Sequence, residues 1–286
     1  MEIVETTSDF RAACDQARAA GLRVGFVPTM GSLHAGHFSL VERAREDNDT
    51  VVVSIFVNPL QFDQTEDVEA YPRDIEEDSA GAEAEGVDVL FTPSVEEMYP
   101  DGYPPPVSVD PGPVGNLFEG VARPGHFRGV LTVVARLFDL AGPSRAYFGE
   151  KDAQQLFLVT RMAREFAMPV EVVSCPTVRS PDGLAVSSRN LRLSAAEREA
   201  AVCLYKALKA GQGMYAVGER DVRHIEAEMA RHIGAEPLAT IDYATVVDAS
   251  SFESPETDIP EGGALAVVAA EVGYARLIDN LLLASG

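Results

Sequence analysis

The chain is poor in positive charge and in cysteine, and it has no long hydrophobic run. Among its 286 residues only three are lysines, and the net charge is −22. Proteins that bind nucleic acids normally carry a basic surface, so this balance argues against DNA or RNA as the main partner. No apolar run reaches the ~18 residues that a membrane-spanning helix needs, which argues against a membrane partner.

The three cysteines, Cys14, Cys175 and Cys203, lie far apart and lack metal-ligand spacing. They indicate neither a disulfide framework nor a zinc site. Residues 1–5, MEIVE, lack the basic start and apolar stretch of a signal peptide. We therefore expect a cytoplasmic protein with reduced thiols. The acidic, lysine-poor composition favours a high-salt cytoplasm, and a GC-rich genome that replaces lysine with arginine is the open alternative.

Strands and helices are expected to alternate over the first 176 residues. Strand-like segments lie at 23–27, 50–57, 87–91, 145–148 and 170–175, and helical segments at 7–20, 37–45, 74–85, 129–140 and 153–166. This alternation predicts an α/β fold with a Rossmann-like, doubly wound parallel sheet over residues 1–176. Beyond this point, helices are expected at 194–210 and 221–232, and strands at 241–247, 264–271 and 275–282. Residues 177–286 are therefore predicted to form a smaller C-terminal α+β domain.

The segment at 28–37, PTMGSLHAGH, follows the first of these strands and leads into a helix. In a doubly wound sheet, anionic ligands bind where the carboxyl end of a strand meets a helix N-terminus. Gly31 and Gly36 allow the backbone to approach such a ligand closely. His34 and His37 lie three residues apart, so both can face a phosphate and stabilise charge as pyrophosphate leaves. Two histidines beside a glycine favour this interpretation over a purely structural role.

A second loop, residues 178–190, is rich in hydroxyl and basic groups and ends in SSRN at 187–190. Two hydroxyls and a guanidinium suit phosphates that are approached from the opposite side. Spacing alone would favour a plain serine-rich turn before a helix. In combination with the segment at 28–37, the loop indicates a site that holds ATP and transfers an adenylyl group.

Lys151 is the only lysine in the first 205 residues, and it follows a strand in FGEKDAQQ at 148–155. In so acidic a chain, positive potential must be concentrated locally for a triphosphate to bind, and this lysine is well placed to supply it. Asp152 can accept hydrogen bonds from ribose hydroxyls. The structural alternative is an exposed turn with an acidic residue at a helix start.

Gln61 and Gln155 also lie just past strands, the first of them in FVNPLQF at 56–62. Two amides offer both donors and acceptors, which suits a small polar substrate that carries hydroxyls and a carboxylate. Either glutamine alone would be taken as an ordinary loop residue.

Several acidic residues begin the helix expected at 74–85, among them Glu77 and Asp78. Such carboxylates can help to hold Mg²⁺ near phosphates, although Mg²⁺ is often held mainly by ATP and water. Acidic residues in a first helical turn also interact favourably with the helix dipole. The structural explanation is favoured, and Glu77 and Asp78 remain weak metal candidates.

These residues together resemble the pantoate–β-alanine ligase (pantothenate synthetase) family of the nucleotidyltransferase superfamily, over essentially the whole chain. The resemblance rests on PTMGSLHAGH at 28–37, FVNPLQF at 56–62, YPR at 71–73, HFRGV at 126–130, FGEKDAQQ at 148–155 and SSRN at 187–190. So many motifs in the same order make the match specific. The SSRN segment corresponds to the mobile loop that is characteristic of the superfamily.

The resemblance implies a two-step reaction. ATP and pantoate give a pantoyl adenylate and pyrophosphate, and β-alanine then attacks the mixed anhydride to release AMP and pantothenate. Mg²⁺, a homodimer and a C-terminal domain that closes as a lid are also implied. The implied ATP site consists of Met30, Gly31, Ser32, Leu33, His34, Ala35, Gly36, His37, Gly149, Glu150, Lys151, Asp152, Val178, Val186, Ser187, Ser188 and Arg189.

The resemblance also assigns roles. His34, His37, Lys151 and Arg189 are the implied catalytic residues. Gln61 and Gln155 are the implied pantoate ligands, with Gln61 also near the β-alanine position. Two residues depart from the family pattern: Val186 stands where methionine is usual, and Arg192 stands where tyrosine is frequent. These departures bear on details of the lid and not on the chemistry.

Three other functions are weighed against this one. A nucleotidyltransferase that joins ATP to a phosphorylated cofactor precursor is disfavoured by Gln61 and Gln155 in their motif context. A non-catalytic ATP-binding regulator would be expected to have lost His37, Lys151 or Arg189, and all three are present. A tRNA synthetase is disfavoured by the acidic composition and by the lack of room for an anticodon-binding domain.

Overall fold

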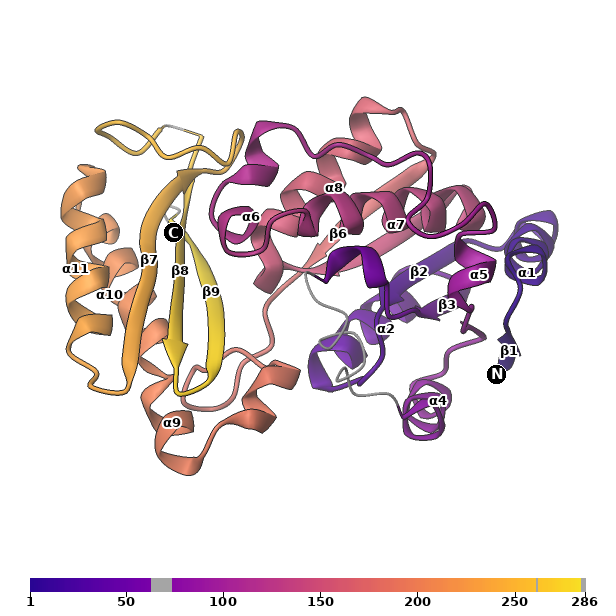
Figure 1. The fold of residues 1–286 in the computed structure, drawn as a ribbon, viewed down its shortest axis with the longest axis horizontal. Coiled ribbons are helices and arrows are strands. Elements are labelled where there is room, and N and C mark those ends of the chain that lie inside the picture. The colour runs from indigo at the N-terminus through magenta and orange to yellow at the C-terminus, as the bar shows by residue number, and fades with distance from the viewer. Residues whose placement is uncertain (63–73, 261, 284–286) are drawn as a thin grey trace. The chain divides into compact units, whose positions relative to one another are not determined.

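The computed structural model describes residues 1–62, 74–260 and 262–283. Its contacts divide the chain into two compact units (Figure 1). Unit 1 comprises Met1–Gly149 and Gln154–Pro176, and unit 2 comprises Glu150–Ala153 and Thr177–Gly286. The short turn that carries Lys151 therefore packs with the C-terminal part of the chain. Among the described residues, no helix combines the length and the apolar content that crossing a bilayer requires.

Unit 1 contains a parallel sheet with six described strands. These are β1 (Glu2–Val4), β2 (Val24–Thr29), β3 (Thr50–Ile55), β4 (Val89–Phe91), β5 (Ser144–Gly149) and β6 (Val170–Cys175), in the order β1-β4-β3-β2-β5-β6. In β3, Val51, Val52 and Val53 are fully buried, as expected for a strand that is covered on both faces. The predicted fold class is confirmed, although the short strand β1 was not predicted.

Helices cover both faces of this sheet. The longer ones are α1 (Thr7–Ala19), α2 (Ala35–Asp47), α4 (Ile75–Ala84), α7 (His126–Ala141) and α8 (Ala153–Glu165), and the short ones are α5 (Val95–Met98), α6 (Glu119–Ala122), η1 (Pro59–Gln61) and η2 (Pro113–Asn116). Figure 1 shows α7 and α8 on one side of the sheet and α2 and α4 on the other. Leu40, Val41 and Ala44 of α2 pack on Val27 and Val53 of the sheet, so the apolar stripe of the helix forms part of the core.

The direction of strand addition reverses between β2 and β5. The chain passes from β2 to β3 and β4 on one side, and β5 then pairs with β2 on the other side. In doubly wound sheets, ligands bind outside the carboxyl ends of the strands at such a reversal. Thr29 ends β2 and Gly149 ends β5, so the segments predicted to bind ATP at 30–37 and 149–152 both leave the sheet at this point.

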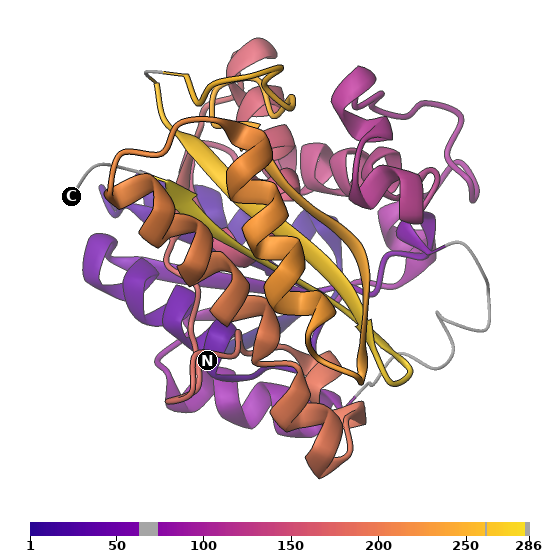
Figure 2. The same ribbon diagram turned by 90° about the vertical axis from the view of Figure 1, so that its left-hand side faces the viewer.

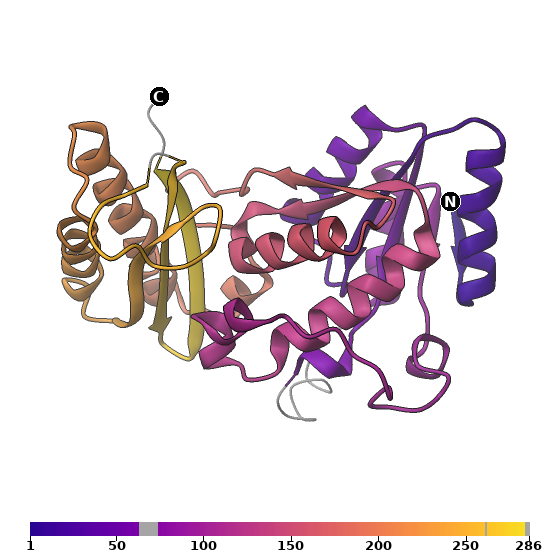
Figure 3. The same cartoon turned by 90° about the horizontal axis from the view of Figure 1, so that it is seen from above.

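Unit 2 is built on an antiparallel sheet of β7 (Ala239–Asp248), β8 (Ala264–Val272) and β9 (Ala275–Leu283), in that order. Its helices are α9 (Ala195–Ala200), α10 (Cys203–Ala216) and α11 (Val222–Gly234), with the short turns η3 (Glu150–Asp152) and η4 (Ser188–Arg192). Figures 2 and 3 show α10 and α11 against the same face of the sheet. The buried side chains of these elements form one core, and the predicted smaller α+β fold is confirmed.

One helix of unit 2 differs from the prediction. The segment expected as a single helix at 194–210 is two helices, because α9 ends at Ala200 and α10 begins at Cys203. Ala201 and Val202 between them are buried. A straight helix buries only a stripe of its surface, whereas the turn here allows consecutive residues from Ala200 to Leu204 to enter the same core.

Candidate nucleotide and substrate site

The loop after β2 has a backbone conformation that requires glycine. Gly31 has a φ of +84°, and a Cβ at this position would lie 2.8 Å from Asp78 Oδ2 and 3.0 Å from Ile55 Cγ2. Ser32 follows with a φ of 52°. Two successive residues with positive φ turn the chain sharply between the end of β2 and the start of α2.

Asp78 of α4 holds this loop in place. The side chain is buried, and its Oδ2 and Oδ1 accept the backbone N–H groups of Ser32 at 2.8 Å and Leu33 at 2.6 Å. Both carboxylate oxygens are therefore used by the main chain. Glu77, the other metal candidate, is exposed. Within the described ranges, no group of three or more His, Cys, Asp or Glu side chains is arranged to hold a metal ion.

His34 and His37 form a reciprocal cap at the start of α2. His34 Nδ1 accepts the backbone N–H of Gly36 at 3.1 Å, and His37 Nδ1 accepts that of His34 at 3.4 Å. The two ring centroids are 4.1 Å apart. A neutral imidazole whose Nδ1 accepts a hydrogen bond carries its proton on Nε2. The pair thus places two Nε2–H donors at the positive end of a helix dipole.

The amide of Gln61 is oriented by buried neighbours. Asn58 Nδ2 donates to Gln61 Oε1 at 3.2 Å, and Tyr99 Oη donates to Asn58 Oδ1 at 2.8 Å. Burial raises the pKa of Tyr99, which keeps its hydroxyl protonated as a donor. Gln61 Nε2 lies 2.8 Å from Met30 Sδ, so its amide nitrogen faces the loop that follows β2.

The main chain of Gln61 is held by α7 and the residues before it. His126 Nδ1 lies 2.9 Å and Arg123 Nη2 lies 3.1 Å from the Gln61 carbonyl oxygen. A Cβ at Gly129 would lie 2.3 Å from the Leu60 carbonyl oxygen, so only glycine lets α7 approach η1 this closely. These contacts give the segment HFRGV at 126–130, which sequence analysis used only for the resemblance, a definite structural role.

The two glutamines that begin α8 have different environments. Gln154 is buried, and its Nε2 donates to the carbonyl oxygens of Val114 at 2.8 Å and Leu117 at 2.9 Å. Its Oε1 accepts the backbone N–H of Glu119 at 3.1 Å. Gln155 is half-buried, and its amide forms no hydrogen bond with any described residue. Gln155, the residue predicted to bind substrate, is therefore available to a ligand, whereas Gln154 is a structural residue.

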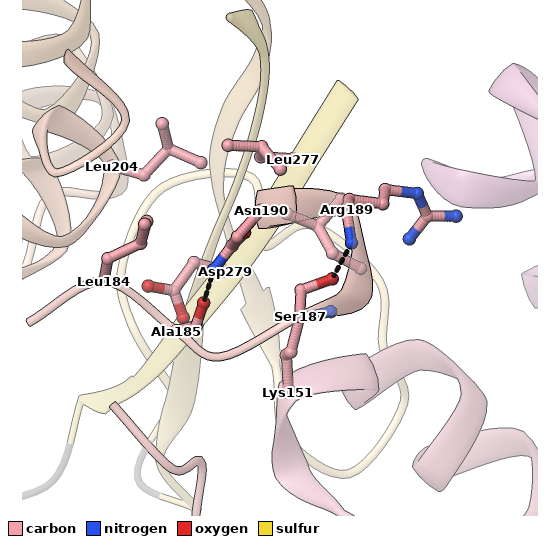
Figure 4. Close-up of a pocket in the computed structure, with 10 residues that line it drawn as sticks. Lys151, Leu184, Ala185, Ser187, Arg189, Asn190, Leu204, Leu277 and Asp279 are labelled. Atoms are coloured by element: carbon pink, nitrogen blue, oxygen red, sulfur yellow. Dashed lines mark hydrogen bonds between the residues drawn. The ribbon is translucent and has the colours of Figure 1, made fainter. Parts of the chain in front are cut away.

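In unit 2, Lys151 shares one pocket with Ser187, Arg189 and Asn190 (Figure 4). The Lys151 side chain is 17% exposed, and its Nζ lies 3.6 Å from Asp152 Oδ1. Figure 4 shows the Arg189 guanidinium pointing away from the other labelled side chains. Arg189 is exposed, and within the described ranges its side chain has neither a hydrogen bond nor an ion pair.

The loop that carries Arg189 has its own internal hydrogen bonds. The Val186 N–H donates to the Val178 carbonyl oxygen at 2.9 Å, so these two predicted ATP residues lie side by side. Ser187 Oγ accepts the Arg189 N–H at 3.3 Å, and Asn190 Nδ2 donates to the Ala185 carbonyl oxygen at 2.9 Å. These bonds shape the backbone of the loop and leave the Arg189 guanidinium for a ligand.

A cavity of about 280 Å³ lies at the carboxyl ends of β3 and β4 in unit 1. Met30, Phe56, Asp78 and Thr92 are among the residues that line it. The Met30 side chain therefore has this cavity and the Gln61 amide as neighbours. Of the segments that carried the resemblance, YPR at 71–73 lies outside the described residues.

Sequence analysis gave no supporting role to the residues that hold the predicted ones in place, although it named Asp78 as a weak metal candidate and quoted Asn58 and His126 within motifs. Asn58, Tyr99 and His126 set the position of Gln61, and Asp78 fixes the loop after β2. Asn58 was signalled by its place three residues before Gln61 at a strand end. Tyr99 gave no signal, and His126 stood in the HFRGV motif without any sign that it contacts Gln61, because both reach Gln61 from distant parts of the sequence.

The parallel, doubly wound sheet, with a glycine- and histidine-containing loop at the point where strand order reverses, defines an α/β nucleotide-binding protein. Comparison with known families narrows this class. The model of the family described as pantoate-beta-alanine ligase matches residues 2–282. The chain belongs to this family.

Individual relatives agree with the family match over their full length. The chain is 50% identical over 283 residues to pantothenate synthetase of Roseiflexus castenholzii, covering 99% of each sequence. The crystal structure of pantothenate synthetase from Thermus thermophilus matches with a TM-score of 0.90 at 49% identity, covering 99% of each chain. The enzyme of Francisella tularensis, crystallised with "Beta-gamma ATP" and β-alanine, matches with a TM-score of 0.80 at 33% identity, covering 100% of this chain and 99% of that one.

Proposed function

We propose that this chain catalyses the ATP-dependent condensation of (R)-pantoate with β-alanine, through a pantoyl adenylate, with release of AMP and pyrophosphate. The product is pantothenate, a precursor of coenzyme A. The observation that carries this proposal is the full-length membership of the pantoate-β-alanine ligase family. The Francisella relative with "Beta-gamma ATP" and β-alanine supports two of the three substrates.

In the first step, a carboxylate oxygen of pantoate attacks the α-phosphorus of ATP. A new O–P bond forms, the bond to the β-phosphate oxygen breaks, and negative charge accumulates on the departing pyrophosphate. We assign His34, His37, Lys151 and Arg189 to the stabilisation of this charge. The paired Nε2–H donors at the start of α2, and the pocket shared by Lys151 and Arg189, support these roles.

We propose that the backbone and small side chains of several segments make the remaining contacts with ATP. In unit 1 these are residues 30–37 and Gly149, and in unit 2 they are residues 150–152, Val178 and residues 186–189. The turn at Gly31 and Ser32 supports close backbone approach of the first segment to an anion. The Val178–Val186 pairing supports a common apolar contact to one ligand group.

Pantoate is assigned to Gln61 and Gln155. The hydrogen bond from Asn58 fixes which way the Gln61 amide points. One hydrogen of the Gln61 nitrogen points to Met30 Sδ, and the other is left as a donor for a carboxylate or hydroxyl. The Gln155 amide has a donor and an acceptor that no described residue occupies. A substrate with hydroxyls beside a carboxylate matches this pair, and Gln61 would also lie near the β-alanine position.

In the second step, the amine of β-alanine attacks the acyl carbon of the mixed anhydride. A C–N bond forms, the C–O bond to AMP breaks, and the amine loses a proton. The chain needs only to position the reactants and to exclude water from the anhydride. We propose that unit 2 supplies this exclusion by closing as a lid over the bound substrates.

Mg²⁺ is proposed to accompany ATP and to neutralise part of its phosphate charge. Because Asp78 gives both its oxygens to backbone N–H groups, it suits a structural role better than a metal-ligand role. The exposed carboxylate of Glu77 is the better candidate of the two. A metal held mainly by phosphates and water is the usual arrangement for Mg²⁺ with a nucleotide.

We further propose that the protein is a cytoplasmic homodimer. The three cysteines are buried and form no disulfide, which suits a reducing compartment. The dimer rests on the family resemblance, and sedimentation of the purified protein tests it directly.

The reaction is tested by incubating the purified protein with ATP, Mg²⁺ and pantoate, with and without β-alanine, and measuring AMP and pantothenate. We expect AMP formation to require pantoate, and pantothenate to appear only when β-alanine is added. AMP release that is independent of pantoate would overturn the ligase assignment.

A further inference from the structure

Strand β9 carries two buried polar residues, Asp279 and Asn280, that are 4% and 7% exposed. Buried polar groups are stable only when they are hydrogen-bonded, so their partners indicate what the pair is for. The two residues bond to different segments. One of these segments carries Lys151, and the other carries Ser187 and Arg189.

Asn280 holds the turn that carries Lys151. Its Nδ2 donates one hydrogen bond to the Glu150 carbonyl oxygen at 2.8 Å and another to the Lys151 carbonyl oxygen at 2.9 Å. The turn η3 spans only three residues, Glu150–Asp152, and so short a helix has little stability of its own. Both amide hydrogens of Asn280 are therefore used to fix the main chain at Lys151.

Asp279 holds the base of the loop that carries Arg189. Its two oxygens accept from Arg179 Nη1 at 2.6 Å and Nη2 at 2.8 Å in a bidentate ion pair. Arg179 also donates to the Gly183 carbonyl oxygen at 3.0 Å, and its guanidinium lies over the Tyr205 ring, 4.5 Å from the centroid.

Arg179 itself forms an isolated β-bridge with Ala185, two residues before Ser187. It also donates from Nη2 to the Asn280 carbonyl oxygen at 3.2 Å, which ties the two anchors together. Figure 4 shows Asp279 on its strand beside the loop that includes Ala185 and Ser187. One dipeptide of β9 thus contacts both segments whose side chains line the pocket.

We propose that Asp279 and Asn280 are positioning residues that set the separation of Lys151 and Arg189, and with it the fit of the pocket to a triphosphate. The inference rests on the proposed function for the identity of the ligand. Asp279 and Asn280 do not touch the phosphates in this account. Asn280 acts through the main chain of Lys151, and Asp279 acts through Arg179.

ATP affinity in the presence of Mg²⁺, measured by titration calorimetry on the full-length protein, tests the role of Asn280. Asn280→Ala removes both hydrogen bonds to the turn, and we expect ATP to bind about tenfold more weakly. Because Asn280 acts through Lys151, it should matter little once that lysine is gone. The double variant Asn280→Ala/Lys151→Ala should therefore bind ATP within about twofold of Lys151→Ala alone.

A matched control comes from the same strand. Gln212 Nε2 donates to the Leu282 carbonyl oxygen of β9 at 3.1 Å but contacts neither segment of the pocket, so Gln212→Ala should leave ATP affinity unchanged. Asn280→Leu, which keeps a branched side chain of similar size, repeats the test if the alanine variant unfolds. If neither variant folds, Asn280 is a folding residue and the proposal is wrong.

The outcomes separate this inference from the proposed function. Equal losses from Asn280→Ala in the native and the Lys151→Ala backgrounds would show independent effects and would overturn the positioning role. Normal ATP affinity in Asn280→Ala would overturn it as well. The unmodified protein is assayed in parallel for pantoate-dependent AMP formation. If the unmodified protein is inactive, the proposed function is wrong. The coupling between Asn280 and Lys151 in ATP binding can still be measured in that case, so the positioning role is tested separately.

Discussion

The loop at 30–37 and the loop at 186–189 differ in whether their charged and polar side chains have hydrogen-bond partners within the protein. In the first, Asp78 accepts two backbone N–H groups, and the rings of His34 and His37 cap the helix that follows. In the second, the backbone is internally bonded, but the Arg189 guanidinium has no partner among the described residues. The first loop is therefore shaped by the protein itself, and the second presents a cation that no described residue pairs.

This difference has a measurable consequence. Residues that shape the first loop should affect both the stability of the protein and its activity, because their hydrogen bonds exist without a ligand. The side chains of Lys151 and Arg189 should affect activity alone. Variants that separate the two effects test the comparison.

The largest effect is expected for Lys151→Ala. Loss of one cation at the developing pyrophosphate charge should lower kcat by about 100- to 1,000-fold, while the midpoint of thermal unfolding stays unchanged. Steady-state kinetics and a thermal melt measure the two quantities. Lys206→Ala, on an exposed position of α10, is the control and should behave like the unmodified protein. A near-normal rate for Lys151→Ala would remove its role.

His34 separates capping from chemistry. Asparagine is a good N-cap residue, so His34→Asn should keep the stability of α2 while it lowers kcat by roughly 100-fold. His34→Ala should lose the same activity and in addition about 1 kcal/mol of stability. Chemical denaturation and turnover together distinguish the variants. Full activity in His34→Asn would mean that the histidine serves only as a cap.

Asp78 and Glu77 are adjacent carboxylates, and we expect their replacement to have different effects on the stability of the protein. Asp78→Ala leaves two backbone N–H groups without their acceptor and should destabilise the protein by about 2–4 kcal/mol. Glu77→Ala, at an exposed position, should change stability by less than about 0.5 kcal/mol. Urea unfolding curves measure both. Equal stability of the two variants would contradict the assignment of Asp78 to the first loop.

Gln154 and Gln155 provide the same contrast within one helix turn. Gln155→Ala should raise the KM for pantoate by about tenfold, with no change in stability, because its amide has no partner among the described residues and is proposed to bind substrate. Gln154→Ala should lose about 1–3 kcal/mol of stability, because three backbone groups lose their partner. An unchanged pantoate KM in Gln155→Ala would reject its proposed role.

The smallest effect is expected at Val186, where the resemblance leads us to expect methionine. Its backbone N–H bonds to Val178, and this bond does not depend on the side chain. Val186→Met should therefore change the KM for ATP by less than about threefold. A larger change would show that the side chain at this position determines how ATP is held.

Much of the fold could be predicted from local patterns, and the exceptions have physical causes. The strand β6 matches its predicted range of 170–175, because valine-rich segments between turns are strong strand signals. The strand β1 was missed because three residues carry too little pattern. The turn at Ala201 and Val202 was missed because neither residue is a glycine or proline that would mark a break, and only packing in the core of unit 2 explains it.

The residues predicted to contact ligands could be selected from the sequence, whereas the residues that support them could not. The residues predicted to contact ligands stand in compact motifs, so that His34, Gln61 and Lys151 could be selected from the sequence. The residues that support them are remote: Asn280 lies 129 positions from Lys151, and His126 lies 65 positions from Gln61. No local pattern connects such positions, because their association depends on the packing of whole strands and helices.

The adenylation step is the central claim, and exchange of labelled pyrophosphate into ATP measures it most directly. With ATP, Mg²⁺ and pantoate but no β-alanine, the protein should catalyse exchange, because reversal of the first step returns label to ATP. Arg189→Ala and Lys151→Ala should greatly reduce this rate. Exchange that proceeds without pantoate, or that requires β-alanine, would contradict a pantoyl adenylate formed by these residues.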